Sequence, residues 1–225
     1  ALMDRKVAMK SFSGIPVKAL LENDEKTTEL NLGNSGCGVT EACVLAECLK
    51  ENSTITVLVL KTCNIGPDGM KPLSEALKAN RTITVLHLIG NKIRDKGTEF
   101  LSDALKANST ITKLDLTHNE ISDDGMDALS DTLKANNKIT KLNLFENPKI
   151  GDKGIDKFIA VLEANDTLLK LDVRCNSAIT IQGAERLTRA LMDRKVAMKS
   201  FSGIPVKAQE SGAGGVQRNS CQGPP

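Results

Sequence analysis

The feature that most constrains this chain is a leucine pair that returns about every 28 residues. Leu-x-Leu, with Val in place of the last leucine, occurs six times, at spacings of 28, 28, 28, 28 and 29 residues. We call the units that begin at these pairs rows 1 to 6. The first leucines are Leu30, Leu58, Leu86, Leu114, Leu142 and Leu171. Because one such unit cannot bury its own apolar face, the rows are expected to stack.

Two further columns share this register. Five residues after the first leucine, rows 3 to 6 have an asparagine, while rows 1 and 2 have Ser35 and Cys63. A glycine then precedes leucines at three- and four-residue spacing, such as Leu101 and Leu105, which is the period of a half-buried helix. Each row is therefore predicted to be strand, turn and helix. The stack is an α/β, right-handed leucine-rich-repeat solenoid (horseshoe) with a parallel β-sheet on the concave face and α-helices on the convex face.

Rows such as ITKLDLTHNEISDDGMDALSDTLKANNK, residues 111–138, resemble the long-unit leucine-rich repeats of the ribonuclease-inhibitor type. The resemblance covers residues 28–199. That subclass occurs in ribonuclease inhibitor, in Ran GTPase-activating protein, in the sensor half of NACHT-type receptors and in many protist repeat proteins. The resemblance implies the fold and does not choose among these functions.

We divide the chain into four segments. Residues 1–27 are an N-terminal cap or junction, 28–199 the array of six units, 200–208 a degenerate terminal repeat or cap, and 209–225 a disordered tail. The tail is polar and rich in Gly and Pro, and offers little to bury. An uncovered row at either end suits end-to-end self-association.

The two ends of the array are related by a duplication. Residues 1–19 recur unchanged at 190–208, which indicates that a block of repeats was duplicated within a longer tandem array. In the second copy, Ser200 and Ser202 are expected at the leucine positions of the next strand. In the first copy, four apolar side chains are expected to cover the open side of row 1. They are Ile15, Val17, Leu20 and Leu21.

The composition argues against nucleic-acid and membrane partners. The formal net charge of +2 gives no field that attracts nucleic acid or an anionic membrane. The chain has no Trp and no Tyr, so it lacks the rings on which bases usually stack. No apolar run approaches the roughly 20 residues that cross a bilayer. We expect no nucleic acid and no membrane among the partners.

The six cysteines show neither a CxxC pair nor a spacing with histidine that suits a metal ion. We expect free thiols in a reducing compartment, because a chain of this length does not need a disulfide framework. The N-terminal residues also lack the apolar stretch and cleavage site of a signal peptide. The sequence therefore predicts a cytoplasmic protein with no metal and no cofactor.

No catalytic site is evident, and we predict that the chain is not an enzyme. His87 and His118 have no Cys, Asp or Ser at the spacing of a catalytic dyad. The segment GNSGCG, residues 33–38, lacks the Lys-Ser/Thr ending of a phosphate-binding loop and fits the turn of row 1. Four glycosylation-like sequences recur at one repeat position, so we interpret them as part of the repeat. They begin at Asn52, Asn80, Asn108 and Asn165.

The residues that flank the buried leucines are expected to face the concave side, because side chains alternate along a strand. Rows 2 and 3 place apolar residues there on neighbouring strands, a grouping that marks interaction sites. Rows 4 to 6 place basic residues there, around two aspartates and a phenylalanine that would serve as an anchor. The apolar candidate surface consists of Val57, Val59, Val85 and Ile89, with His87 among them. The basic candidate surface consists of Lys113, Lys141, Lys170, Arg174, Asp115, Asp172 and Phe145.

These surfaces predict a non-catalytic module that binds a partner protein or peptide on its concave face. The competing explanation is that β-branched residues favour strands and lysine favours solvent. Two alternatives follow from the resemblance. A GTPase-activating accessory like Ran GTPase-activating protein requires an arginine at the strand-to-helix edge, for which Arg94 is the candidate. A sensor fragment of a NACHT-type receptor requires a nucleotide-binding domain upstream.

Overall fold

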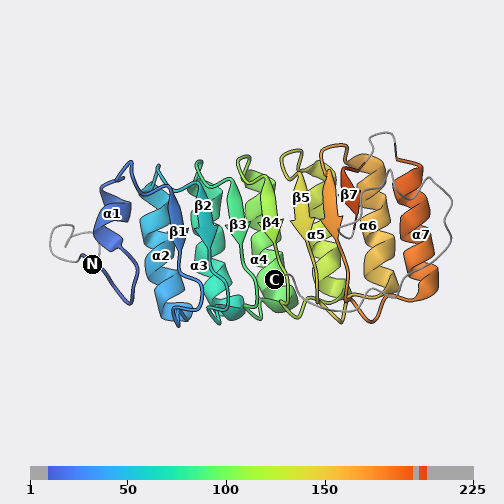
Figure 1. The fold of residues 1–225 in the computed structure, drawn as a ribbon, viewed down its shortest axis with the longest axis horizontal. Coiled ribbons are helices and arrows are strands. Elements are labelled where there is room, and N and C mark those ends of the chain that lie inside the picture. Colours follow the sequence, from blue (N-terminus) through green and yellow to red (C-terminus); the bar gives the residue numbers. More distant parts are fainter. Residues whose placement is uncertain (1–9, 195–197, 202–225) are drawn as a thin grey trace.

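The computed structural model describes residues 10–194 and 198–201, within which seven helices and seven strands alternate (Figure 1). The helices are α1 (Val17–Leu21), α2 (Val39–Glu51), α3 (Gly66–Ala79), α4 (Arg94–Ala107), α5 (Asp123–Ala135), α6 (Asp152–Ala164) and α7 (Ile181–Met192). The strands are β1 (Glu29–Asn31), β2 (Val57–Val59), β3 (Val85–His87), β4 (Lys113–Asp115), β5 (Lys141–Asn143), β6 (Lys170–Asp172) and β7 (Ser200–Phe201).

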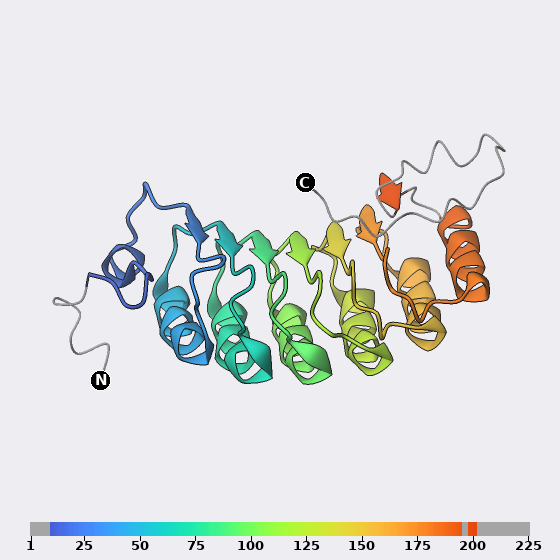
Figure 2. The same cartoon turned by 60° about the horizontal axis from the view of Figure 1, so that its bottom comes forward.

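The strands form one parallel sheet in chain order from β1 to β7. Neighbouring strands are in the register of the repeat, so that Leu30 pairs with Leu58 and Leu58 with Leu86. Figure 2 shows the strands on the inner side of a shallow arc and the helices on its outer side. The predicted α/β leucine-rich-repeat solenoid is confirmed.

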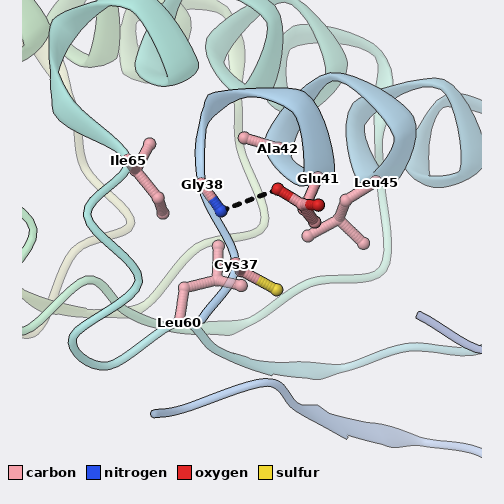
Figure 3. A pocket seen from close by; sticks show the side chains of 7 residues that line it. All are labelled: Cys37, Gly38, Glu41, Ala42, Leu45, Leu60 and Ile65. Carbon is pink, nitrogen blue, oxygen red and sulfur yellow. Dashed lines mark hydrogen bonds between the residues drawn. The ribbon is translucent and has the colours of Figure 1, made fainter. Parts of the chain in front are cut away.

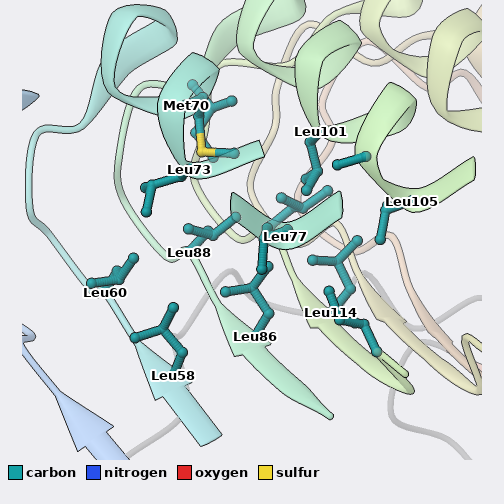
Figure 4. Close-up of a cluster of buried hydrophobic side chains, with 14 of the residues drawn as sticks. Leu58, Leu60, Met70, Leu73, Leu77, Leu86, Leu88, Leu101, Leu105 and Leu114 are labelled. Carbon is teal, nitrogen blue, oxygen red and sulfur yellow. The ribbon is translucent and has the colours of Figure 1, made fainter. Parts of the chain in front are cut away.

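The leucine pair of each row lies in the core. In row 3, Leu86 and Leu88 are each 1% exposed, whereas their neighbours Val85 and His87 are half-buried on the concave side. Helix side chains such as Leu77 meet the strand leucines from the opposite layer (Figure 4). Truncating such a buried leucine to alanine typically costs about 2–5 kcal/mol, so each row depends on the rows beside it.

The asparagine column joins consecutive rows through buried hydrogen bonds. Oδ1 of Asn119 accepts the backbone N–H of Asn91 at 3.0 Å, and its Nδ2 donates to the carbonyl of Leu88 at 2.8 Å. Asn147 in turn accepts the N–H of Asn119 at 2.9 Å. These three asparagines are 0% exposed. The column therefore satisfies backbone groups that the interior would otherwise leave unpaired.

A second asparagine column follows the helices and accounts for the glycosylation-like sequences. Nδ2 of Asn80 donates to the carbonyl of Leu49 in the preceding helix at 3.0 Å, and its Oδ1 accepts the N–H of Ile83 at 2.9 Å. The equivalent residues are Asn52, Asn108 and Asn165. All four are at most 4% exposed. Their side-chain amides are thus structural, as the repeat interpretation predicts.

Glycines near the helix starts allow neighbouring helices to approach closely. A Cβ atom on Gly154 would lie 2.6 Å from Oδ1 of Asp123 and 3.2 Å from the side chain of Met126. Asp123, at the start of α5, accepts the N–H groups of Gly151 at 2.7 Å and Gly154 at 2.9 Å. Asp95 of α4 acts in the same way on the start of α5. Each aspartate satisfies N–H groups that the first turn of the next helix leaves free.

The N-terminal end of the array is covered as predicted. Ile15, Val17 and Leu20 belong to the core cluster and are at most 4% exposed. Leu21 is partly buried and packs against the same cluster. The short helix α1 thus shields the apolar side of row 1.

The C-terminal end differs from the expectation. Phe201, not Ser200, takes the leucine position, because Phe201 pairs with Leu171 and Ser200 pairs with Lys170. The interval from Leu171 to Phe201 is 30 residues, so the loop after α7 holds more residues than its counterparts. Phe201 packs against the core cluster, which keeps the apolar layer continuous into β7. Ser202 and the predicted tail lie outside the described residues.

Candidate protein-binding surface

The apolar candidate surface spans β2 and β3. Val57 and Val59 flank a buried leucine on β2, and Val85 pairs with Val57 across the sheet. These valines and Ile89 are all half-buried rather than fully exposed. Val85 lines a hollow on the concave side, and Ile89 lies beyond the end of β3. The apolar area open to a partner is smaller than full exposure would give.

Phe145 is not the exposed anchor that the sequence predicted. Its side chain is 6% exposed, and the guanidinium of Arg174 lies 5.5 Å from the centre of its ring. Arg174 is itself held by Asp172, with 2.6 Å between Nη2 and Oδ2. The prediction was wrong because β5 ends at Asn143, so strand alternation no longer determines where residue 145 points.

The basic candidate surface contains a ladder of three lysines. Lys113 pairs with Lys141 across β4 and β5, and Lys141 with Lys170 across β5 and β6. Like charges directly opposite each other on neighbouring strands repel. The positive charge of Lys113, followed by that of Lys170, lowers the pKa of Lys141. Within the described residues, no carboxylate forms an ion pair with any of the three.

The aspartates of the same strands are, by contrast, already partnered. Oδ1 of Asp115 accepts the N–H and the hydroxyl of Thr117 at 3.0 and 2.6 Å, and Nδ1 of His87 lies 3.7 Å from Oδ2. Burial raises the pKa of Asp115, but the neighbouring imidazole of His87 and the hydrogen bonds from Thr117 outweigh it and hold the pKa below its ordinary value. Asp172 is held by two nitrogens of Arg174. Among the described residues, the lysines are therefore the charges of this surface that have no counter-ion.

These side chains surround one hollow of about 410 Å³ on the concave side, which extends from β3 to β7. Of the predicted residues it brings together Val85, His87, Lys113, Asp115, Lys141, Lys170 and Asp172. The others lie outside it, and these are Val57, Val59, Ile89, Phe145 and Arg174. It also includes Asn143 and Ser200, which the sequence did not single out. Asn143 occupies the middle strand position that Asp115 and Asp172 occupy in their rows, so the sequence could have indicated it. Ser200 could not be assigned from the sequence, because the interval from Leu171 to Phe201 is 30 residues and shifts the register of the last strand.

The two histidines contact carboxylates of the next row. His87 lies beside Asp115, as above, and Nδ1 of His118 is 3.6 Å from Oε1 of Glu146. The side chain of His118 is 61% exposed, and that of Glu146 is 50% exposed. The solvated His118–Glu146 pair is typical of a charged surface rather than of a catalytic dyad.

Arg94, the candidate for GTP hydrolysis, is the first residue of α4. Its Nε donates to Oε2 of Glu120, in the equivalent loop of row 4, at 2.9 Å. Its side chain thus takes part in an ion pair between rows. Nothing in this arrangement points to a role in GTP hydrolysis.

The GNSGCG segment forms a structural turn (Figure 3). The N–H of Gly38 donates to Oε2 of Glu41 at 2.9 Å, which closes the first turn of α2. The depression there is lined by apolar side chains such as Leu60 and Ile65 and leaves no room for a ligand. This geometry agrees with the prediction of a turn rather than a phosphate-binding loop.

The cysteine prediction is correct at four positions and wrong at one. In the part of the chain that the structure describes, the free thiols are Cys37, Cys43, Cys48 and Cys63. Cys175 is disulfide-bonded, and Cys221 lies outside the described residues. The described side chains form no group of three or more His, Cys, Asp or Glu that could hold a metal ion. No helix within the described ranges is long and apolar enough to cross a membrane.

The geometry defines a leucine-rich-repeat domain with a charged hollow on its concave sheet. Residues 51–74 match a leucine-rich repeat family. Residues 65–193, more than half of the chain, match the leucine-rich domain of TMOD/LMOD, the tropomodulin and leiomodin proteins. The chain belongs to the TMOD/LMOD leucine-rich domain family.

Solved structures are similar to this chain at the level of the fold. One is described as "Leiomodin-1 Actin-Binding Site 2 (ABS2)", with 24% identity, coverage of 81% of this chain and 88% of the other, and a TM-score of 0.49. The other is the tropomodulin C-terminal domain of Caenorhabditis elegans, with 16% identity, coverage of 78% and 89%, and a TM-score of 0.51. No curated protein sequence matches the chain.

The family found differs from those that the sequence resemblance named. The leucine-rich repeat itself is confirmed, and the match over residues 65–193 supplies the family. Neither the Ran GTPase-activating protein alternative nor the NACHT-type alternative gains support from the comparisons or from the position of Arg94.

Proposed function

We propose that this chain is a non-catalytic protein-binding module that holds its partner on the concave face, and that actin is the partner. The observation that carries the proposal is membership of the TMOD/LMOD leucine-rich domain family over residues 65–193. We name actin because the family match covers residues 65–193 and a leiomodin-1 domain is described by name as an actin-binding site. We also propose that the repeat units are of the long, ribonuclease-inhibitor-like subclass.

Two features of the concave face support it as the contact surface. The half-buried Val57 and Val59 of β2 lie beside the hollow, Val85 of β3 lines it, and both strands belong to one continuous sheet. The buried asparagine column fixes the strand-to-helix turns of rows 3 to 6, so the surface is ordered before a partner arrives. Binding to a preorganised surface avoids the entropy cost of ordering it.

The test is co-sedimentation of the chain with actin filaments, together with a binding titration against monomeric actin. The variant is Val59→Asp/Val85→Asp, which places two charges on the apolar candidate surface. We expect it to weaken binding about tenfold or more, since burying unpaired carboxylates in an interface is costly. Circular dichroism and thermal unfolding of each protein show whether the fold is intact.

A matched control introduces the same two charges elsewhere. Val39 and Ile181 are exposed apolar residues, 41% and 71% accessible, and each is the first residue of its helix. Val39→Asp/Ile181→Asp is expected to leave binding unchanged, and aspartate is favourable at a helix start. If the wild-type chain binds neither filaments nor monomeric actin, the proposal that actin is the partner is wrong. If the two double variants bind actin equally well, the proposal that the concave face is the contact surface is wrong.

Three further predictions accompany this proposal. We predict that the protein is located in the cytoplasm and that the array associates end to end. We also predict that it binds neither nucleic acid nor membranes. Each is open to a direct measurement, such as fractionation, sedimentation velocity or a nucleic-acid binding titration.

A further inference from the structure

The lysine ladder leaves a charge pattern that protein binding in general does not explain. Along the strand starts, the column that faces the partner reads Val57, Val85, Lys113, Lys141 and Lys170 from β2 to β6. Apolar side chains thus lie at one end and three cations at the other. A partner segment that covers the whole column must therefore place apolar side chains against the valines and negative charges against the lysines, which fixes the direction in which it lies.

The three cations dominate the charge of their surface. The basic candidate surface has four cations, Lys113, Lys141, Lys170 and Arg174, and two carboxylates, Asp115 and Asp172. Arg174 already neutralises Asp172, and His87 and Thr117 occupy Asp115. A partner that brings carboxylates supplies the counter-ions that the described residues do not, and relieves the repulsion between neighbouring lysines.

The spacing of the ladder selects the conformation of the partner. Neighbouring strands are about 4.8 Å apart, so lysines on β4, β5 and β6 repeat at that distance. Side chains three or four apart on an α-helix are about 5–6 Å apart. Side chains on one face of an extended strand repeat at about 6.8 Å. A helix laid across the strands keeps its carboxylates in step with the lysines, whereas an extended segment loses register after one or two contacts.

We propose that the concave face, from Val57 on β2 through the adjoining hollow to Lys170 on β6, binds an amphipathic acidic α-helix of a partner protein laid across the strands. Three carboxylates at successive helical turns pair with Lys113, Lys141 and Lys170, and apolar side chains further along the same helix face meet Val85 and Val57. The span from β2 to β6 is about 19 Å, or about 13 helical residues. The inference rests on the proposed function in that both use the concave face, but it does not require that the partner be actin.

The probe is a capped 16-residue alanine- and glutamine-based helix. Glutamates at its second, sixth and ninth positions and leucines at its thirteenth and sixteenth positions share one face. A control peptide has the same composition, with the glutamates moved to the fourth, eighth and eleventh positions on the opposite face. Fluorescence anisotropy measures the Kd of each peptide for the full chain at low salt and at about 0.3 M salt.

The test variant is Lys141→Glu, and the matched control is Lys153→Glu on α6. Lys153 is 74% exposed and lies on the helical layer. The carboxylate introduced at position 141 lies between two lysines, so it removes repulsion and is not expected to lower stability. We expect Lys141→Glu to weaken binding of the first peptide about tenfold or more, and Lys153→Glu to change it less than about twofold.

A charge exchange tests the contacts themselves. The triple variant Lys113→Glu/Lys141→Glu/Lys170→Glu is expected not to bind the first peptide. It is expected to bind a version of that peptide in which lysines replace the three glutamates. The inference is overturned if the two glutamate peptides bind equally or if Lys141→Glu and Lys153→Glu weaken binding alike. It is also overturned if a single-stranded oligonucleotide of similar length binds more tightly than the first peptide.

Actin co-sedimentation separates this inference from the proposed function. Ladder-dependent peptide binding without actin binding supports the helix site and removes actin as the partner. Actin binding that Lys141→Glu leaves intact, combined with no discrimination between the peptides, supports the proposed function and overturns the helix site.

Discussion

Between rows 3 and 6, buried asparagines link each strand-to-helix turn to the next, whereas rows 1 and 2 have Ser35 and Cys63 at the same position. The Cys63 thiol donates to the carbonyl of Leu32 at 3.2 Å, and the Ser35 hydroxyl bonds only within its own row. The helix starts differ in the same way. Asp95 bridges α4 to the next helix, but Pro67 occupies the equivalent position in α3.

The hollow lies over the part of the array that has both bridging columns. It extends from β3 to β7, and the asparagine column runs from row 3 to row 6. The difference indicates that the repeat is most regular beneath the hollow, which is the proposed binding surface. Because equivalent positions in different rows have different side chains, the contribution of each row to the free energy of unfolding can be tested by matched substitutions.

The largest effect is expected at the centre of the asparagine column. Asn119→Ala leaves the N–H of Asn91 and the carbonyl of Leu88 without a partner in the interior. Each buried unsatisfied group costs about 1–3 kcal/mol, so the free energy of unfolding should fall by about 3 kcal/mol or more. Urea denaturation measures it.

Ser35→Ala is the matched change at the same repeat position in row 1. Ser35 is exposed, and its hydroxyl donates to the carbonyl of Leu32. Water can replace that bond, so the loss should be about 0.5 kcal/mol or less. Equal losses for Asn119→Ala and Ser35→Ala would contradict the comparison between the two parts of the array.

A smaller effect is expected at the helix starts. Asp95 accepts the N–H of Ser122 at 2.7 Å, its hydroxyl at 2.7 Å, and the N–H of Gly125 at 3.1 Å. Asp95→Ala removes this bridge to α5 and should cost about 1–2 kcal/mol, as the loss of a helix cap does. Asp68→Ala is the control, since Asp68 is exposed in the first turn of α3, where aspartate contributes only a few tenths of a kcal/mol. A cost at Asp68 equal to that at Asp95 would show that the bridge between helices contributes nothing.

The sequence predicted the fold because the buried columns repeat. The leucine, asparagine and glycine columns each perform one structural task in every row, so their register appears without any coordinates. The outward orientation of Val57, Lys113 and their equivalents followed from the same alternation. The unpaired state of the lysine ladder did not, because it depends on which carboxylates find partners elsewhere.

The sequence failed where the period or the strand stops. Phe145 lies beyond the end of β5, so its burial under Arg174 depends on a contact between rows that alternation cannot predict. Ser200 and Phe201 were assigned one position out of register because the last interval is 30 residues. The hollow is lined in part by Ser200 of β7, so its extent could not be predicted without the register of β7 on β6.

The only gain in stability is expected from completing the asparagine column in row 2. In Cys63→Asn, the new amide can donate to the carbonyl of Leu32, as Asn91 does to that of Leu60. Its oxygen can accept the N–H of Ser35, which now bonds to the carbonyl of Leu32 at 3.2 Å. Restoring a repeat consensus of this kind typically adds about 0.5–2 kcal/mol, so the urea midpoint should rise.

Cys48→Asn separates this gain from the general cost of burying an amide. Cys48 is 3% exposed on α2, and burial raises the pKa of its thiol to about 11. An asparagine there meets apolar neighbours and no repeat partner, so stability should fall by about 1–3 kcal/mol. A loss at Cys63→Asn as large as that at Cys48→Asn would mean that rows 1 and 2 depart from the asparagine column because their sulfur-lined interior excludes an amide. In that case the two parts of the array differ by packing around Cys37 and Cys63, and not merely by missing hydrogen bonds.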